Sequence, residues 1–408
     1  MKAGIWRTQS GSWFAAIVLV VLLVQITAAT LLTWSFIDQS LGKVSAFSAK
    51  TLVIGGITTG AMALLALTVY LLGFHVIAEK RRRLHEIESE HWTTRWVSVL
   101  FEQEDCPKGP LSRAAQGALV ALTESMKGPE AVRLRALIAL YGIDERLVNE
   151  ISSSDPRRRR DALEGLAMAR LPQALDALIS SMVDARPEIR AMAARAASRT
   201  IASISSSQGR EHFALRFGDA LVEGGLARGV VEEMLLLTDT AAPSIERHLL
   251  ASPGLPERLI APVIDAAGRS QASSLVPLVL AHSRSQNPEV RAAVLRFLSR
   301  RGEAALAGRV IVLGGMDDDI EFVRVNAVRA ARKQPLAQVL PTLTERLGDP
   351  SWWVRKGASE TLAAMGPVGE EALFAAAQTH PDRFARDMAA QVIVDSGLLP
   401  TSGTNLAA

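Results

Sequence analysis

The chain has 408 residues, of which 49% are hydrophobic and 21% charged, and its single Cys excludes a disulfide framework and a multi-cysteine zinc site. The hydrophobic fraction is too high for a disordered chain. Residues 1–83 carry eight Lys and Arg against two Asp and Glu, whereas residues 84–408 carry 37 against 40. The large C-terminal part has no excess positive charge, which argues against a nucleic-acid-binding protein.

Two uncharged apolar stretches dominate the N-terminal segment, at residues 13–37 and 51–78. Each exceeds the roughly 20 residues needed to span a bilayer core, so the sequence predicts two transmembrane helices in a hairpin. Lys2 and Arg7 precede the first stretch, and a basic run at residues 80–83 follows the second. Positive charge marks the cytoplasmic side. We therefore expect a multi-pass protein of the inner membrane with both termini in the cytoplasm.

An alternative for the first stretch is a cleaved signal peptide, with residues 13–24 as its apolar core and Thr27 to Ala29 as the cleavage site. The second helix and its basic run would still keep the rest of the chain cytoplasmic. The expected divisions are a membrane anchor at 1–83, a juxtamembrane helix and linker at 84–110, and a tail at 398–408.

From about residue 111 the sequence repeats with a period of 31–33 residues. Each unit begins with a turn residue and usually Pro, reaches an Arg and continues as an Ala-rich apolar helix. The period accommodates two helices of about 12 residues and two turns. One unit cannot bury its own apolar faces, so consecutive units must stack. We predict an all-α fold in which the hairpin precedes a solenoid of eight or nine helix pairs over residues 111–397, with an unclear register around 200–260 and a loop at 200–209.

The motif Asp-Pro-x-x-Val-Arg-x-x-Ala is matched best by residues 287–298 and 349–365. It resembles the HEAT-like repeat family, in the short form named after phycobilisome lyases. The resemblance implies that the recurrent Arg ties one unit to the next through acidic side chains or carbonyls. The residues that match this position are Arg159, Arg190, Arg291, Arg324, Arg355 and Arg386. A phosphate-binding row of arginines is the alternative, and the negative charge balance argues against it.

No catalytic motif is present in the sequence. The segment from His85 to Ser89 begins like a zinc-protease motif, but Ser89 replaces the second His. His85, Glu88 and His91 share part of a helix face, and a metal site there competes with a solvated charged helix. The acidic run at residues 317–319 is expected to favour a helix N-terminus rather than to hold a cation. We expect no metal and no cofactor.

HEAT-like families include bilin lyases and deoxyhypusine hydroxylases, and the resemblance implies such an enzyme as the alternative function. The hydroxylases hold iron with several His-Glu pairs on their repeats. This chain has one such pair, His85-Glu86, and it lies outside the repeats. We therefore expect no enzymatic activity, no catalytic residues and no small-molecule substrate.

Two clusters are candidates for contacts with a partner. Trp352 and Trp353 begin a repeat helix and are followed by Arg355 and Lys356. Trp is enriched at binding hot spots, and adjacent helical residues point about 100° apart, so at least one Trp is expected at the surface. The alternative is that one Trp packs its helix against the preceding one.

The second cluster consists of Arg157, Arg158 and Arg160, beside the structural Arg159. Four adjacent arginines at a helix start oppose the helix dipole. An acidic partner or anionic lipid headgroups would explain them, and a solvated first turn is the alternative.

These features predict a membrane-anchored, non-enzymatic scaffold. It would bind a protein partner, itself membrane-associated, at the cytoplasmic face, and it would contact the bilayer through residues 13–37 and 51–78. Proteins that look like this chain can accompany membrane glycosyltransferases in exopolysaccharide systems. The resemblance therefore implies that setting.

Overall fold

The computed structural model describes residues 24, 27, 31, 46–204, 206–270, 272–301 and 306–398. The expected first transmembrane helix at 13–37 lies outside these residues except for three positions, and so does the tail after Leu398. The chain divides into two compact units, residues 1–92 and residues 93–408.

The first unit contains most of one long helix, α2, which runs from Ala46 to Leu100 over 55 residues and ends in the second unit. The expected second transmembrane helix and the juxtamembrane helix are therefore parts of one continuous helix. By length and composition, one described stretch, Met62–Leu100, is able to cross a membrane. Its most apolar window has a mean hydropathy of 1.8 and no buried residue.

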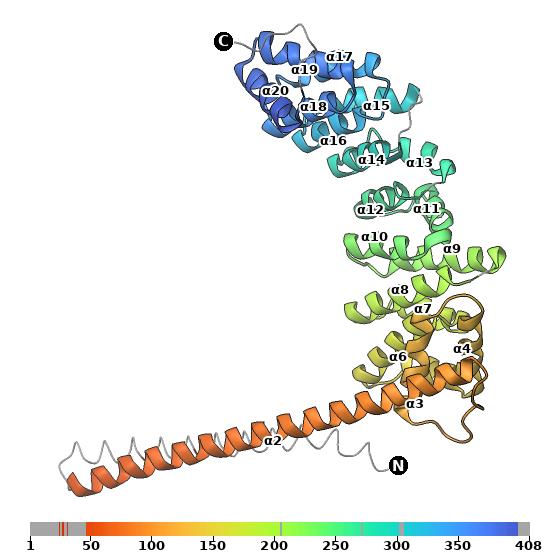
Figure 1. Cartoon of the computed structure of the whole chain (residues 1–408), viewed down its shortest axis with the longest axis vertical. Coiled ribbons are helices and arrows are strands. Elements are labelled where there is room, and N and C mark those ends of the chain that lie inside the picture. Colours follow the sequence, from red (N-terminus) through yellow and green to blue (C-terminus); the bar gives the residue numbers. More distant parts are fainter. Residues whose placement is uncertain are drawn as a thin grey trace. The chain divides into compact units, whose positions relative to one another are not determined.

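The second unit is all-helical over its described residues (Figure 1). After α2 its helices are α3 (Arg113–Ser125), α4 (Pro129–Leu140), α5 (Ile143–Ile151), α6 (Pro156–Ala169), η1 (Pro172–Ala174), α7 (Leu175–Ser181), α8 (Pro187–Ala202), α9 (Ser207–Glu223), α10 (Arg228–Leu237), η2 (Asp239–Ala241), α11 (Ala242–Ala251), α12 (Glu257–Ala267), η3 (Ser273–Leu275), α13 (Val276–Leu280), α14 (Pro288–Arg301), α15 (Leu306–Met316), α16 (Glu321–Ala331), α17 (Leu336–Arg346), α18 (Trp352–Ala363), α19 (Pro367–Thr379) and α20 (Arg383–Asp395).

These helices form two layers in which each member packs on the next. The first layer runs in the order α6, α8, α10, α12, α14, α16, α18 and α20. The second layer contains the intervening helices, with contacts from α5 to α7, α9, α11 and α13 and from α15 to α17 and α19. Helix pairs thus stack in sequence order, as the repeat period predicts.

Alanine sets the close spacing of the first layer. Ala193, Ala293, Ala327 and Ala358 are completely buried on α8, α14, α16 and α18. Small side chains let neighbouring helices approach closely, while larger residues such as Phe297 fill the space between layers. The core is therefore continuous from one pair to the next.

The middle of the repeat array is more regular than its sequence indicates. The expected loop at residues 200–209 is a short turn, because α8 continues to Ala202 and α9 begins at Ser207. The Ser206 side chain accepts a hydrogen bond from the Gly209 amide and caps α9. The Ser-rich composition therefore marks a helix start rather than a break.

Candidate interaction surface

One turn geometry recurs before six helices of the first layer. Its first residue, here called the turn residue, accepts a hydrogen bond on its side chain from the amide two residues later, at 2.8–3.2 Å. The turn residues are Ser153, Asp184, Ser285, Asp318, Asp349 and His380. This local bond competes with helix formation and fixes where each helix begins.

The recurrent Arg lies six positions after each turn residue. In five turns its Nη1 donates to the carbonyls of the turn residue and of the next residue, as Arg190, Arg291, Arg324, Arg355 and Arg386 do. The guanidinium thus donates hydrogen bonds to carbonyl oxygens that accept none from a helix amide.

Three of the six recurrent arginines reach the turn residue of the next unit. Arg159 pairs with Asp184, and Arg291 binds Asp318 through two bonds of 2.7 and 2.8 Å. Arg324 binds Asp349 at 2.9 and 3.0 Å, and these bonds raise the pKa of the Arg324 guanidinium. Among the described residues, the hydrogen bonds of the Arg190, Arg355 and Arg386 guanidinium groups go to the carbonyls of their own turns.

Exposed aromatic residues occupy the second position of the last three helices of the first layer. Phe322, Trp353 and Phe384 each lie four residues after their turn residue, with exposed fractions of 39%, 58% and 65%. We call these three side chains the aromatic row. At the corresponding position the earlier units have Arg157, Glu188 and Glu289. The row is therefore confined to the C-terminal repeats.

Neighbouring side chains contact Trp353 and Phe384 of the aromatic row. The rings of Trp352 and Trp353 meet edge to face, with centroids 4.7 Å apart. Lys356 Nζ lies 5.1 Å from the centroid of the Trp352 ring, and the guanidinium of Arg355 lies 5.6 Å from that of Phe384. A cation at this distance from a ring centroid is attracted to the ring face. The four residues singled out from sequence thus lie together.

The sequence analysis missed Phe322 and Phe384. Both lie 31 positions from Trp353, so aligning the units on their period would have found them. Both Trp352 and Trp353 are exposed, at 42% and 58%, so neither packs its helix into the core.

The basic cluster at the start of α6 is also at the surface. Arg157, Arg158 and Arg160 are exposed, and Arg158 pairs with Asp155 at 3.8 Å. Asp155 caps α6 by accepting from the Arg157 amide. The structure brings these arginines together with each other but not with the aromatic row, which belongs to helices far along the stack.

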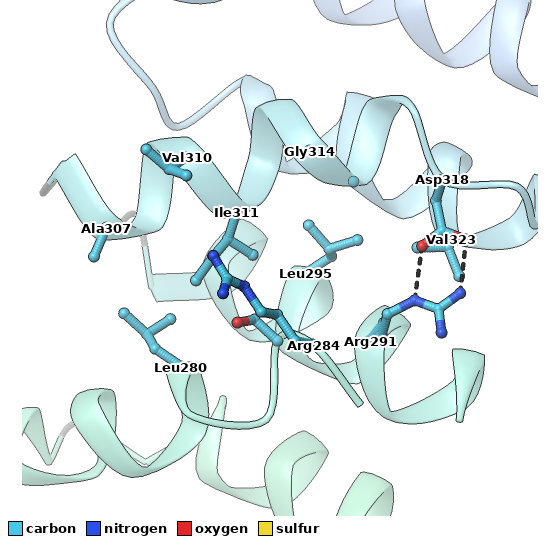
Figure 2. Close-up of a pocket in the computed structure, with 12 residues that line it drawn as sticks. Leu280, Arg284, Arg291, Leu295, Ala307, Val310, Ile311, Gly314, Asp318 and Val323 are labelled. Carbon is cyan, nitrogen blue, oxygen red and sulfur yellow. Dashed lines mark hydrogen bonds and ion pairs between the residues drawn. The ribbon is translucent and has the colours of Figure 1, made fainter. Parts of the chain in front are cut away.

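A cleft of about 760 Å³ lies between α13 and α15. Figure 2 shows Leu280, Leu295 and Ile311 around it, with the Arg291–Asp318 pair at one end. Asp318 is therefore used within the fold. In the part of the chain that the structure describes, no group of three potential metal ligands occurs.

A family model for HEAT repeats, HEAT_2, matches residues 312–394. This stretch carries HEAT repeats. It contains the whole aromatic row and extends from α15 to α20. No curated protein is significantly similar to the chain in sequence.

Solved structures with a similar course of the chain include two karyopherins and an enzyme. A Kap121p mutant has 13% identity and a TM-score of 0.44 over 89% of this chain and 44% of that one. Kap95p bound to RanGDP has 12% identity and a TM-score of 0.45 over 75% and 46%. Human deoxyhypusine hydroxylase has 17% identity and a TM-score of 0.26 over 77% and 97%. All three TM-scores lie below 0.5, so these structures carry no information on the function of this chain.

Proposed function

We propose that this chain is a membrane-anchored, non-enzymatic scaffold whose C-terminal HEAT repeats bind a protein partner at the cytoplasmic face of the inner membrane. The aromatic row is the observation that carries the proposal. Three large rings exposed at one repeat position are costly in water and useful in an interface, where Trp, Tyr and Phe supply much of the binding energy. Arg355 and Lys356 would form the polar rim around them.

The anchor part of the proposal rests on α2. Its residues between Met62 and Ile77 include apolar side chains that are more than half exposed, such as Leu65 and Val69. A bilayer would cover this surface. We propose that α2 pairs with a helix at 13–37 in a transmembrane hairpin and that the basic residues at 80–83 hold both termini in the cytoplasm. Reporter fusions at position 45 and at the C-terminus test this topology, and a periplasmic C-terminus would contradict the cytoplasmic location.

The proposed setting is a glycosyltransferase system for exopolysaccharide, and the proposed partner is a membrane-associated protein of that system. Affinity purification of the full chain from native membranes, followed by mass spectrometry, tests this setting. Recovery of a membrane glycosyltransferase is the expected result. A partner from an unrelated system would leave the scaffold role standing and overturn the setting.

The binding surface is tested by substitution within the aromatic row. Trp353→Ala should weaken capture of the purified partner by about 2 kcal/mol, because a central interface Trp is typically worth that much. Leu140→Ala removes a side chain that is 68% exposed on α4, away from the row, and should leave binding unchanged. Thermal melting of both variants checks that the fold persists. Equal binding by the wild type and Trp353→Ala would remove the row from the interface.

The enzyme alternative is tested by metal analysis of the purified chain. A scaffold should contain no stoichiometric metal. One or more iron ions per chain would favour an enzyme of the hydroxylase type.

A further inference from the structure

A second cleft lies at the other end of the second unit, between the turn that joins α3 to α4 and the C-terminal end of α6. Its volume is about 490 Å³. Three basic side chains from three segments line it: Lys127 before α4, Arg135 within α4, and Arg170 at the end of α6. The carboxylates of the chain contribute none of its lining residues.

These three cations have no acidic partner among the described residues. Salt bridges in this region involve Arg199 with Glu124, at 2.7 Å, and Arg195 with Glu233, but not Lys127, Arg135 or Arg170. The Nε atom of Arg170 is buried and has no hydrogen-bond acceptor among the described residues, as is also true of the Nε atoms of Arg190 and Arg355. Such a nitrogen is costly to bury unless a water, ion or ligand satisfies it.

The environment of Arg170 is unfavourable for a cation. Burial lowers the pKa of its guanidinium, and the nearby charges of Arg199 and Arg135 lower it further, while Glu124 opposes them. Arg170 also has a left-handed backbone conformation, with φ of 52° and ψ of 55°, at a helix C-cap where Gly is the usual residue. The fold thus holds a strained, half-buried Arg close to two like charges.

The first turn of α4 lines the same cleft. Gly128 is its N-cap and provides no side-chain hydrogen bond, and the cleft is also lined by Pro129, Ala131 and Val132. Helix N-termini favour negative charge. The nearest acid there is Glu130, in the first turn, and it forms no ion pair with any of the three cations.

We propose that this cleft binds a phosphate group. A guanidinium offers paired donors that match phosphate oxygens, and three unpaired cations suit a dianion better than a single carboxylate. The group can belong to free phosphate or a soluble phosphate monoester, or to a lipid headgroup. The site is separate from the aromatic row, so phosphate binding can be tested independently of the scaffold function.

The test measures binding of inorganic phosphate to the full chain by calorimetry, at constant ionic strength set with chloride. A second arm replaces phosphate with phosphatidylcholine vesicles that contain or lack phosphatidic acid. Arg135→Gln and Arg170→Gly should each weaken binding by about tenfold or more in the arm where the wild type binds. Arg284→Gln, at the cleft beside α13, is the matched control and should bind normally.

Thermal melting gives a second readout that a structural role for Arg170 would not produce. Without phosphate, Arg170→Gly should melt at or above the wild-type temperature, because it relieves the left-handed strain and the charge repulsion. Phosphate should raise the melting temperature of the wild type and of Arg284→Gln but not of Arg170→Gly. Absence of binding in both arms, or binding that persists in both cleft variants, would overturn the proposal.

Discussion

The C-terminal repeats and the middle repeats stack their helices in the same order but join them with different chemistry. On α14 and α16, the recurrent Arg binds the carboxylate of the next turn, Asp318 or Asp349, and we call this bond the turn clamp. In the middle, the fourth residue of α12, where α14, α16 and α18 have the recurrent Arg, is Ile260, and Arg258 at the second position is exposed and forms no bond with a described residue. There, Asp265 on α12 binds Arg296 on α14 instead, at 2.8 and 2.6 Å.

This difference distinguishes the interactions that determine the order of the helices from the interactions that add stability to them. The first layer is continuous through α10 and α12, where the turn clamp is missing, so burial of apolar faces suffices to specify the stacking. The Arg–Asp bonds add local stability and fix the helix starts in the C-terminal repeats. Phe322 and Trp353 of the aromatic row lie on α16 and α18, whose starting turns are clamped, and rigid elements make better binding surfaces than mobile ones.

The largest expected effect comes from removing a clamp. The Asp349 side chain is 1% exposed and its Arg324 partner 12% exposed. Asp349→Ala leaves a buried guanidinium without its counter-charge and also removes the acceptor for the Ser351 amide. Breaking a buried pair from one side costs about 3–5 kcal/mol in unfolding free energy. Urea denaturation measures it.

Arg258→Ala is the control from the middle repeats, and as an exposed substitution it should change stability by about 0.5 kcal/mol or less. If the two variants lose equal stability, the clamped and unclamped turns do not differ energetically and the comparison fails.

The middle repeats also contain a buried carboxyl group that lowers the stability of the fold when it ionises. Glu246 on α11 is fully buried, both of its carboxylate oxygens lack a partner among the described residues, and burial raises its pKa from 4.5 to about 7. The folded state therefore retains a proton that the unfolded state releases. The contribution of this group to stability is highest below pH 4.5 and falls as the pH rises through 7. The loss contributed by this group is about 3 kcal/mol.

Glu246→Gln tests this because its side chain cannot ionise. The variant should match the wild type below pH 4.5 and exceed its unfolding free energy by about 3 kcal/mol at alkaline pH. Urea denaturation of both proteins across the pH range isolates the contribution of this one group. A difference that does not vary with pH would show that Glu246 keeps its ordinary pKa.

The sequence predicted the helix pairs of the C-terminal repeats well, because turn residue, Pro and Arg recur there with Ala-rich faces. It did not predict the partners of each Arg. The acid that Arg291 binds lies 27 residues away and the one that Arg324 binds lies 25 away, so pairing depends on how two units stack. The burial of Glu246 could not be predicted either, since nothing in its local sequence distinguishes it from an exposed helical Glu. The exposure of Trp352 and Trp353 was predicted in part, whereas the rest of the row required the register of neighbouring units.

Tight packing in the clamped region gives a smaller expected effect. Ala358 on α18 is completely buried in the layer between α16 and α20. Ala358→Leu adds a branched side chain that the close helix contact cannot accommodate, so it should lower stability by about 1–3 kcal/mol. Ala375→Leu on α19 is the control, because Ala375 is exposed. An unchanged melting temperature for Ala358→Leu would mean that this contact is looser than its burial indicates.

The smallest effect is a gain obtained by extending the clamp by one unit. Arg355 lies 25 positions before His380, the same spacing as between Arg324 and Asp349, but His380 offers it no carboxylate and the Arg355 Nε has no acceptor. In His380→Asp, the new carboxylate would accept from the Asp382 amide, as His380 Nδ1 does at 3.1 Å, and would also face Arg355. Hydrogen bonds to charged groups stabilise by about 1.5–3 kcal/mol, and ordering a partly exposed Arg that already contacts Phe384 reduces the expected gain to about 1 kcal/mol.

The control is His380→Asn, which keeps an acceptor for the Asp382 amide but has no charge. Urea denaturation of both variants separates the contribution of the amide bond from that of the ion pair with Arg355. Equal stability of His380→Asp and His380→Asn would show that a carboxylate at position 380 adds no stability. The clamp would then require a more buried position, such as that of Asp349.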